Sequence, residues 1–237
     1  MILGSMISVM GVDYIDARTW ALNICMAIWS MRLSLYIACR HNGEDWRYVK
    51  LRERYEKCGT VAYYIFAFLM IFMLQAAFAV CVNYTAMRTT SYSSTNTNLF
   101  GQGLEWTDYL GFAMFVVGLL FEVLGDAQLS AHLADPDPNK GKFCKRGLWR
   151  YTRHPNYFGD TMIWWGFYVV GCSLPNGWKT IYSPIVMNFL LRFVSGVPFL
   201  ERKAALHPEW AQYAAETNCF VPWFVNKNAV PAQSDSY

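Results

Sequence analysis

Five stretches of the chain are long runs of apolar residues, separated by polar and charged segments. A helix that crosses a bilayer needs about 20 mostly apolar residues, and each run is close to that length or longer. The predicted spans are residues 15–39, 61–84, 109–129, 157–174 and 182–200. We see no alternating pattern that predicts a strand. The pattern therefore predicts an all-α, polytopic membrane helix bundle with about five transmembrane helices.

The connecting segments differ in charge. Basic residues gather in the segments after the first, third and fifth predicted spans: Arg40, Arg47, Lys50, Arg52, Arg54 and Lys57, then Lys140, Lys142, Lys145, Arg146, Arg150 and Arg153, then Arg202, Lys203 and Lys227. The opposite segments contain only Arg88 and Lys179. By the positive-inside rule, the basic side faces the cytosol or an equivalent compartment such as the mitochondrial matrix. Five spans place the C-terminus on that side.

Composition agrees with a membrane protein. The chain has 237 residues, of which 54% are hydrophobic and 16% charged, whereas soluble domains carry about 25% charged residues. We expect a single membrane-embedded domain over residues 1–237, with a frayed polar tail at 231–237. The net charge of +3 gives no reason to expect a nucleic-acid partner. The expected location is the endoplasmic reticulum or another organelle membrane, including the mitochondrial inner membrane.

Cysteine and histidine show no metal-binding pattern. The seven cysteines are scattered, with no C-x-x-C pair, and are expected to be buried, reduced thiols. The four histidines lack zinc-type spacing. No metal site is predicted.

Ionisable residues occur inside two predicted spans. Arg32, Tyr36 and Arg40 follow one another at four-residue spacing in the first span, and Glu122 and Asp126 do so in the third. That spacing places each set on one helix face. Such groups usually face a protein interior or a water-filled cavity. Two interpretations are open: a polar ligand cavity, or a structural role in ion pairs and snorkelling.

A second polar feature is the motif GLWRYTRHPNYFGD before the fourth predicted span. Pro155 suits the first turn of a helix, whose N-terminus favours an anion. Arg150 and Arg153 can bind phosphate in a forked geometry, while Asn156 and Tyr157 add hydrogen-bonding groups. The alternative is that this basic segment only meets lipid headgroups.

The string RYTRHPNYFGD resembles the C-terminal signature of the steroid 5-alpha-reductase superfamily, especially its small bacterial-type branch. Sterol C14 and delta-7 reductases carry a closely similar string, and isoprenylcysteine and phospholipid methyltransferases a looser one. The similarity extends to FEVLGDAQL, to RFVSGVPFLERK, to WAQYAAETNCFVPW and to IWSMRLSLYIACRHNGEDWRY. It covers roughly residues 15–225.

The resemblance implies a membrane enzyme that binds NADPH from the cytosolic face and transfers hydride to an activated C=C bond of a lipid-like substrate. Asp126 and Asn156 match nucleotide-contacting residues of the family, and Glu122 stands where the family has an Asn. Tyr157 and Asp160 would lie at the reacting end as catalytic residues. The implied cofactor-binding residues are Arg32, Tyr36, Arg40, Glu122, Asp126, Arg150, Arg153, His154, Asn156 and Glu201.

Two departures concern the substrate side. Trp29 falls where steroid reductases have the acidic Tyr, and an indole donates a hydrogen bond without delivering a proton. The first one or two helices of the family are missing or reduced to residues 1–12. The cofactor half is expected to be present and the substrate half incomplete.

Three functions are consistent with these residues. The first is an NADPH-dependent reductase of a sterol or acyl derivative in lipid metabolism. The second is a catalytically degenerate member that serves as a structural subunit of a membrane complex. The third is an S-adenosylmethionine-dependent methyltransferase, whose relatives share the Arg-His-Pro and a later Glu, here Glu201. The expected partners are the lipid bilayer, a hydrophobic small-molecule substrate and, for the second function, other membrane subunits.

Overall fold

The computed structural model describes residues 16–40, 49, 52, 53, 55, 59–95, 103–137 and 139–226. The described residues are helical or irregular, and none of them forms a strand. The chain divides into two compact units, Met1–Gly103 and Leu104–Tyr237. Each unit is described by itself below.

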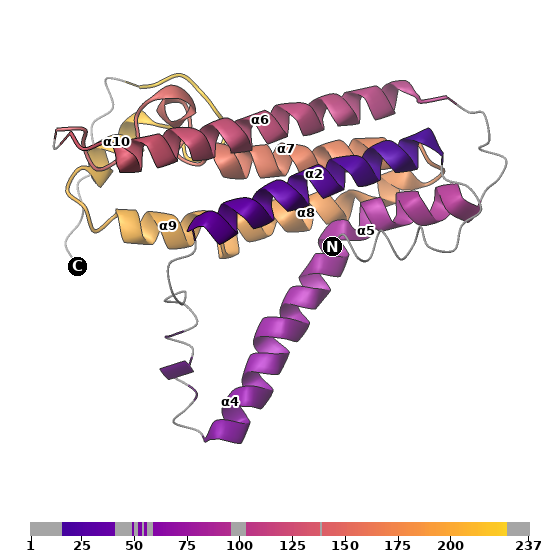
Figure 1. Cartoon of the computed structure of the whole chain (residues 1–237), viewed down its shortest axis with the longest axis horizontal. Coiled ribbons are helices and arrows are strands. Elements are labelled where there is room, and N and C mark those ends of the chain that lie inside the picture. The colour runs from indigo at the N-terminus through magenta and orange to yellow at the C-terminus, as the bar shows by residue number, and fades with distance from the viewer. Residues whose placement is uncertain are drawn as a thin grey trace. The chain divides into compact units, whose positions relative to one another are not determined.

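The first unit contains α2 (Ala17–Arg40) and a long composite helix. The composite helix consists of α4 (Thr60–Ala67), a π-helical segment η2 (Phe68–Met73) and α5 (Leu74–Thr95). The three segments follow one another without a gap, and Figure 1 shows that the helix changes direction between the part labelled α4 and the part labelled α5. The predicted spans 15–39 and 61–84 thus fall on helices.

Hydrogen bonds cap the start of α2 and join this helix to α5. The side chain of Asp16 accepts a hydrogen bond from the backbone N–H of Thr19 at 2.9 Å, and this caps the helix N-terminus. The side chain of Asn23 reaches Thr90 Oγ1 at 3.4 Å, so α2 contacts α5.

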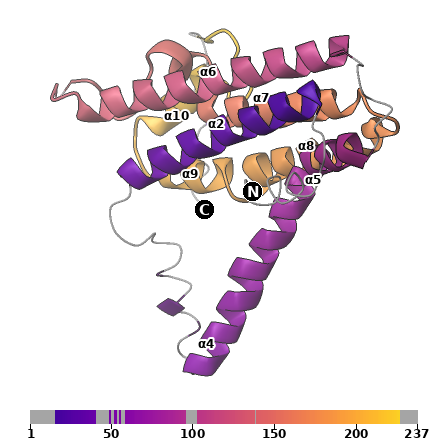
Figure 2. The same ribbon diagram turned by 45° about the vertical axis from the view of Figure 1, so that its right-hand side comes forward.

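The second unit is built on two antiparallel helices, α6 (Trp106–Ala134) and α7 (Pro155–Gly171), which lie side by side in both views (Figures 1 and 2). Glu105 and Asp108 form a capping box at the start of α6. The shorter elements that follow or connect them are η4 (Gly147–Arg150), η5 (Gly177–Ile181), α8 (Tyr182–Phe189), η6 (Leu190–Val194), α9 (Val197–Ala204) and α10 (Trp210–Glu216).

Glycine allows α6 and α7 to approach closely. A Cβ atom on Gly118 would lie 2.5 Å from the carbonyl oxygen of Gly159, and one on Gly111 would lie 2.5 Å from that of Gly166. The two pairs are seven residues apart on each helix, so both lie on one seam. The helices are therefore in backbone contact along the seam, as small residues permit in membrane helix pairs.

The all-helical membrane prediction is confirmed. Among the described residues, four helical segments are long and apolar enough to cross a bilayer: Ala17–Cys39, Thr60–Tyr92, Trp106–Ala134 and Gly177–Ala204. They match the first, second, third and fifth predicted spans. Their apolar side chains are largely exposed, as expected for helices that face lipid. The chain is therefore an integral membrane protein.

The fourth predicted span, 157–174, falls mostly on α7. This helix has 17 residues and is shorter than the four candidate membrane helices. At 1.5 Å per residue its length is about 26 Å, slightly less than the roughly 30 Å of a hydrocarbon core. A crossing by α7 stays a prediction, and its packing along α6 gives the means to test it.

Candidate functional site

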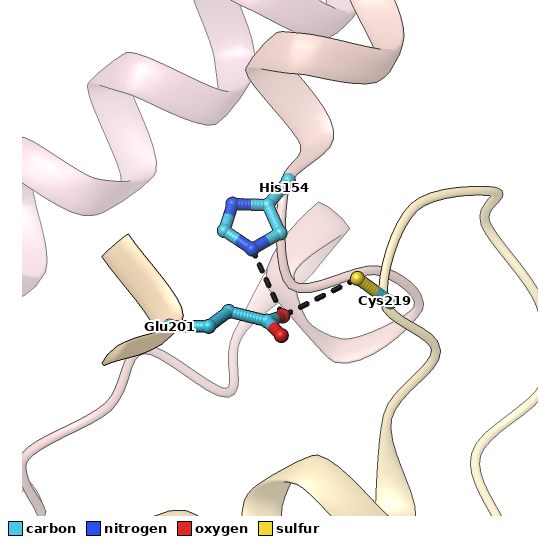
Figure 3. A group of neighbouring side chains, drawn as sticks. All are labelled: His154, Glu201 and Cys219. Atoms are coloured by element: carbon cyan, nitrogen blue, oxygen red, sulfur yellow. Dashed lines mark hydrogen bonds and ion pairs between the residues drawn. The ribbon is translucent and has the colours of Figure 1, made fainter. Parts of the chain in front are cut away.

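A cluster of four polar side chains lies where α7, α9 and the C-terminal loop meet. Glu201 Oε1 accepts a hydrogen bond from Arg153 Nε at 2.9 Å, lies 3.1 Å from His154 Nε2 and accepts one from Cys219 Sγ at 3.3 Å. Figure 3 shows the Glu201 carboxylate pointing between His154 and Cys219. We call Arg153, His154, Glu201 and Cys219 the Glu201 cluster. Three segments far apart in sequence thus converge on one carboxylate oxygen.

Arg153 also fixes the loop that carries Cys219. Its Nη1 donates to the carbonyl oxygens of Ala214 and Thr217, and its backbone N–H donates to that of Asn218 at 2.8 Å. The side chain is only 11% exposed. The guanidinium therefore already donates hydrogen bonds to acceptors within the protein. A phosphate would have to bind Arg153 in addition to these contacts. The predicted phosphate contact stays a prediction.

Cys219 acts in this cluster as a thiol donor. Burial and the neighbouring charge and hydrogen bond of Glu201 raise the pKa of its thiol. The thiol is therefore protonated at neutral pH and can donate to the carboxylate.

The Glu201 cluster also has the residue types of a metal centre. One ligand-type atom from each of His154, Glu201 and Cys219 lies within 4.8 Å of the others, and zinc accepts these ligands. A metal would need the thiolate form of Cys219 and would have to share Glu201 with a guanidinium. The contacts in the structure fit a carboxylate surrounded by hydrogen-bond donors better than a metal site.

The start of α7 positions the central motif. Pro155 occupies the first turn, as predicted, and His154 is buried immediately before it. One residue later, the amide nitrogen of Asn156 donates to Asp126 Oδ1 of α6 at 3.3 Å. The structure thus brings together two residues that the sequence placed in a cofactor site.

Gln128 has a structural role that spacing alone did not reveal. Its Oε1 accepts from the backbone N–H of Leu148 at 2.9 Å, and Trp149 Nε1 donates to the carbonyl oxygen of Gly125 at 2.8 Å. Gly147, with φ 56°, leaves the room that the Gln128 side chain occupies. These contacts hold η4 against the end of α6 and so orient the motif that follows.

The two predicted catalytic residues lie one turn apart on α7. The ring of Tyr157 stacks on that of His154, with 5.6 Å between centroids. Asp160 Oδ1 accepts a hydrogen bond from Trp164 Nε1 at 3.1 Å. Tyr157 is therefore adjacent to the Glu201 cluster, and Asp160 lies deeper along the same helix.

Glu122 and Arg150 differ in their surroundings. Glu122 is 2% exposed, and its Cγ would be 3.0 Å from a Cβ atom placed on Gly159, so it lies against α7. Arg150 is exposed at the end of η4, with its guanidinium 6.0 Å from the ring centroid of Tyr151.

The remaining predicted residues belong to the first unit. The Arg32 guanidinium lies over the ring of Tyr36, with 5.6 Å to the centroid, so the four-residue spacing does place them on one face of α2. Trp29 is buried. The side chain of Arg40 is outside the described residues. A cavity shared with Asp126 and Asn156 would join the two units and stays a prediction.

An open pocket of about 550 Å³ borders the Glu201 cluster on the side of the C-terminal loop. Arg153 forms part of its wall, opposite residues 214–219 and 223–226. Trp223 and Phe224 at its rim are 66% and 78% exposed.

Comparison with known proteins places the chain in a family. It belongs to the family described as "Protein of unknown function (DUF1295)", whose model matches residues 1–217. A Schizosaccharomyces pombe protein, described as uncharacterised, is 24% identical over an alignment of 184 residues; the match covers 68% of this chain and 51% of the relative. The chain therefore spans about half the length of the curated relative it matches. No solved structure matches it.

Sequence reasoning missed two residues. For Cys219 the sequence predicts only a buried, reduced thiol, whereas in the structure it is half-buried and donates to Glu201. Arg192 lies in the predicted fifth span and within RFVSGVPFLERK, yet was assigned no role. A charged residue inside an apolar run was the available signal for Arg192, whereas nothing in the local sequence indicates the Cys219 contact.

Proposed function

We propose that this chain is a membrane-embedded, NADPH-dependent reductase of an activated C=C bond in a lipid-like substrate, such as a sterol or an acyl derivative. The observation that carries the proposal is the convergence of polar groups at the start of α7. Asn156 meets Asp126 there, and two residues earlier His154 and Arg153 meet Glu201. These are residues that the family resemblance implies for cofactor binding.

Electrostatics support an anionic cofactor at this place. The dipole of α7 favours negative charge at its N-terminus. The segment between α6 and α7 adds Lys140, Lys142, Lys145, Arg146 and Arg150. A nucleotide that carries several phosphates is attracted to such a basic end.

The reaction adds a hydride and a proton across the C=C bond; NADPH would supply the hydride when bound, and water would supply the proton. Tyr157 and Asp160 are three residues apart on α7 and so project from the same side of the helix. In this proposal the ring and hydroxyl group of Tyr157 orient NADPH and the substrate where they react. Asp160 accepts a hydrogen bond from the substrate.

A second candidate is an S-adenosylmethionine-dependent methyltransferase. The contacts of Arg153 and His154 with Glu201 favour it, because the resembling methyltransferases share the Arg-His-Pro and a later Glu. The Asn-Tyr-Phe-Gly-Asp continuation of the motif favours the reductase.

The test is titration of the detergent-purified protein with NADPH and, separately, with S-adenosylmethionine. We expect NADPH to bind and Asn156→Leu to weaken it about tenfold to a hundredfold, since a hydrogen bond to a charged group contributes about 1.5–3 kcal/mol. Asn139→Leu is the matched control, because Asn139 is exposed in the loop between α6 and η4. The control should bind as tightly as wild type.

Two outcomes contradict the reductase proposal, and a third concerns Asn156 alone. Binding of S-adenosylmethionine but not NADPH would favour the methyltransferase. Binding of neither, by a folded protein that co-purifies with defined membrane partners, would favour a structural subunit. Equal NADPH affinity in wild type and both variants would remove Asn156 from the site.

A further inference from the structure

Arg192 is a charged residue inside a candidate transmembrane helix. It belongs to η6, within the segment Gly177–Ala204, and is half-buried. Its guanidinium lies 5.4 Å from the ring centroid of Phe193, and no carboxylate pairs with it among the residues that the structure describes. Charged groups at membrane depth are costly and usually mark a ligand or ion site.

Arg192 lines a pocket of about 450 Å³ that adjoins the one beside Arg153, because Asn218 and Cys219 line both. One wall comes from Asn188, Arg192 and Phe193, and the other from residues 218–221 of the C-terminal loop. The hydroxyl group of Thr161 donates to Asn188 Oδ1 at 2.7 Å, which fixes the amide and leaves its NH₂ group as a donor. Within the described part of the chain, that NH₂ group has no hydrogen-bond acceptor.

The pocket therefore combines the Arg192 cation and the Asn188 amide with the polar residues Asn218 and Cys219. Its apolar lining comes from Phe193, Phe220 and Val221. Phe193 and Val221 are 65% and 60% exposed, so their apolar surfaces continue from the pocket outward. A guanidinium binds phosphate or carboxylate in a forked geometry. An exposed apolar surface beside it, on a membrane helix, suits a hydrocarbon chain.

We propose that this pocket binds an amphipathic anion, with a phosphate or carboxylate head on Arg192 and Asn188 and an acyl chain along Phe193 and Val221. The bound head group neutralises a charge that has no carboxylate partner among the described residues. The proposal does not depend on the reductase activity, because it concerns a different pocket and a ligand without a nucleotide.

The test compares melting temperatures in neutral maltoside micelles during titration with dodecyl phosphate. Inorganic phosphate and NADPH are titrated in parallel, to separate a lipid-type anion from a soluble one. We expect dodecyl phosphate to stabilise the wild-type protein and its apparent affinity to fall about tenfold or more in Arg192→Gln. Arg192→Lys should recover part of the affinity, because an ammonium keeps the charge but not the fork. Arg202→Gln is the matched control, since Arg202 is exposed on α9 and outside the pocket.

A second variant keeps the test valid if Arg192→Gln fails to fold. Val221→Glu changes an exposed side chain and places a carboxylate at the pocket, so it should abolish binding by repulsion. Equal stabilisation of wild type, Arg192→Gln and Val221→Glu would overturn the proposal. It would also be overturned if inorganic phosphate or NADPH bound as tightly as dodecyl phosphate with the same dependence on Arg192, because the site would then take a soluble anion.

Discussion

Glu201 illustrates how single residues are held in this protein. Its carboxylate is 24% exposed and interacts with three donor groups on one oxygen. Such a group is stable only while its donors stay in place, because a buried charge without partners is costly. Arg153 in turn depends on Glu201, because its guanidinium is buried and has as partners the Glu201 carboxylate and two backbone carbonyl groups.

The first prediction concerns the stability that Glu201 contributes. Removing one partner of a fully buried ion pair costs about 3–5 kcal/mol, and partial exposure lowers this, so Glu201→Ala should reduce the free energy of unfolding by on the order of 2 kcal/mol. Lys203→Ala, at an exposed position of the same helix, should cost less than about 0.5 kcal/mol. Denaturant titration in detergent, followed by tryptophan fluorescence, measures both.

A double-mutant cycle then separates the ion pair from simple packing. Arg153→Ala should cost less in the Glu201→Ala background than in the wild type, since the carboxylate that it would leave behind is already absent. Additive effects of the two substitutions would show that the pair is not coupled.

At the level of elements, the α6–α7 seam determines where the site lies. Gly111 and Gly118 of α6 face Gly166 and Gly159 of α7, which fixes the register of the two helices. Pro155 then lies opposite Gly125, at 3.2 Å from the position of a Cβ atom there. This register brings Asp126 and Asn156 within hydrogen-bonding distance.

The second prediction is that the seam does not tolerate a methyl group. In Gly118→Ala the new Cβ would be 2.5 Å from the backbone oxygen of Gly159, and backbone cannot move aside as a side chain can. We expect a loss of about 1–3 kcal/mol in unfolding free energy, as for overpacked cores. Gly103→Ala is the control, because nothing lies within 4 Å of its Cβ position. If the two variants unfold at the same denaturant concentration, close packing along the seam is wrong.

At the level of the whole molecule, the open question is how many times the chain crosses the bilayer. The four long helices cross by length and composition, whereas α7 is shorter. The paired glycines place α7 alongside the first two thirds of α6, in the antiparallel direction. A helix in this position lies at the same depth as α6, so we expect α7 to cross as well.

The third prediction tests this with cysteines introduced singly at Ser94, Lys142 and Lys179 and labelled by a membrane-impermeant reagent. Ser94 and Lys142 flank α6, and Lys142 and Lys179 flank α7. If both helices cross, Lys142→Cys labels from one side, and Ser94→Cys and Lys179→Cys label from the other. Labelling of Lys179→Cys together with Lys142→Cys would show that α7 does not cross, and would leave four spans with the C-terminus on the opposite side from that predicted.

Local sequence was sufficient for the helices and for the motif. Long apolar runs leave few alternatives to helix in a bilayer, because every backbone polar group needs an internal partner there. Pro155 marks the start of α7 for an equally local reason. The four-residue spacing of Arg32 and Tyr36 likewise predicted their contact, since helix geometry alone places them together.

Only the tertiary structure decided which side chains meet across long distances in sequence. The contact of Cys219 with Glu201, and of the 218–221 loop with Arg192, depends on how α9 and the C-terminal loop return to the start of α7. The tight α6–α7 register depends on glycine pairs whose partners no periodicity identifies. The sequence by itself determined that this is a helical membrane protein with polar groups in its spans, because hydropathy and helix period are local properties. The tertiary structure decided that Arg153, His154 and Glu201 form one cluster and that Arg192 lines a second pocket, because both depend on packing between distant segments.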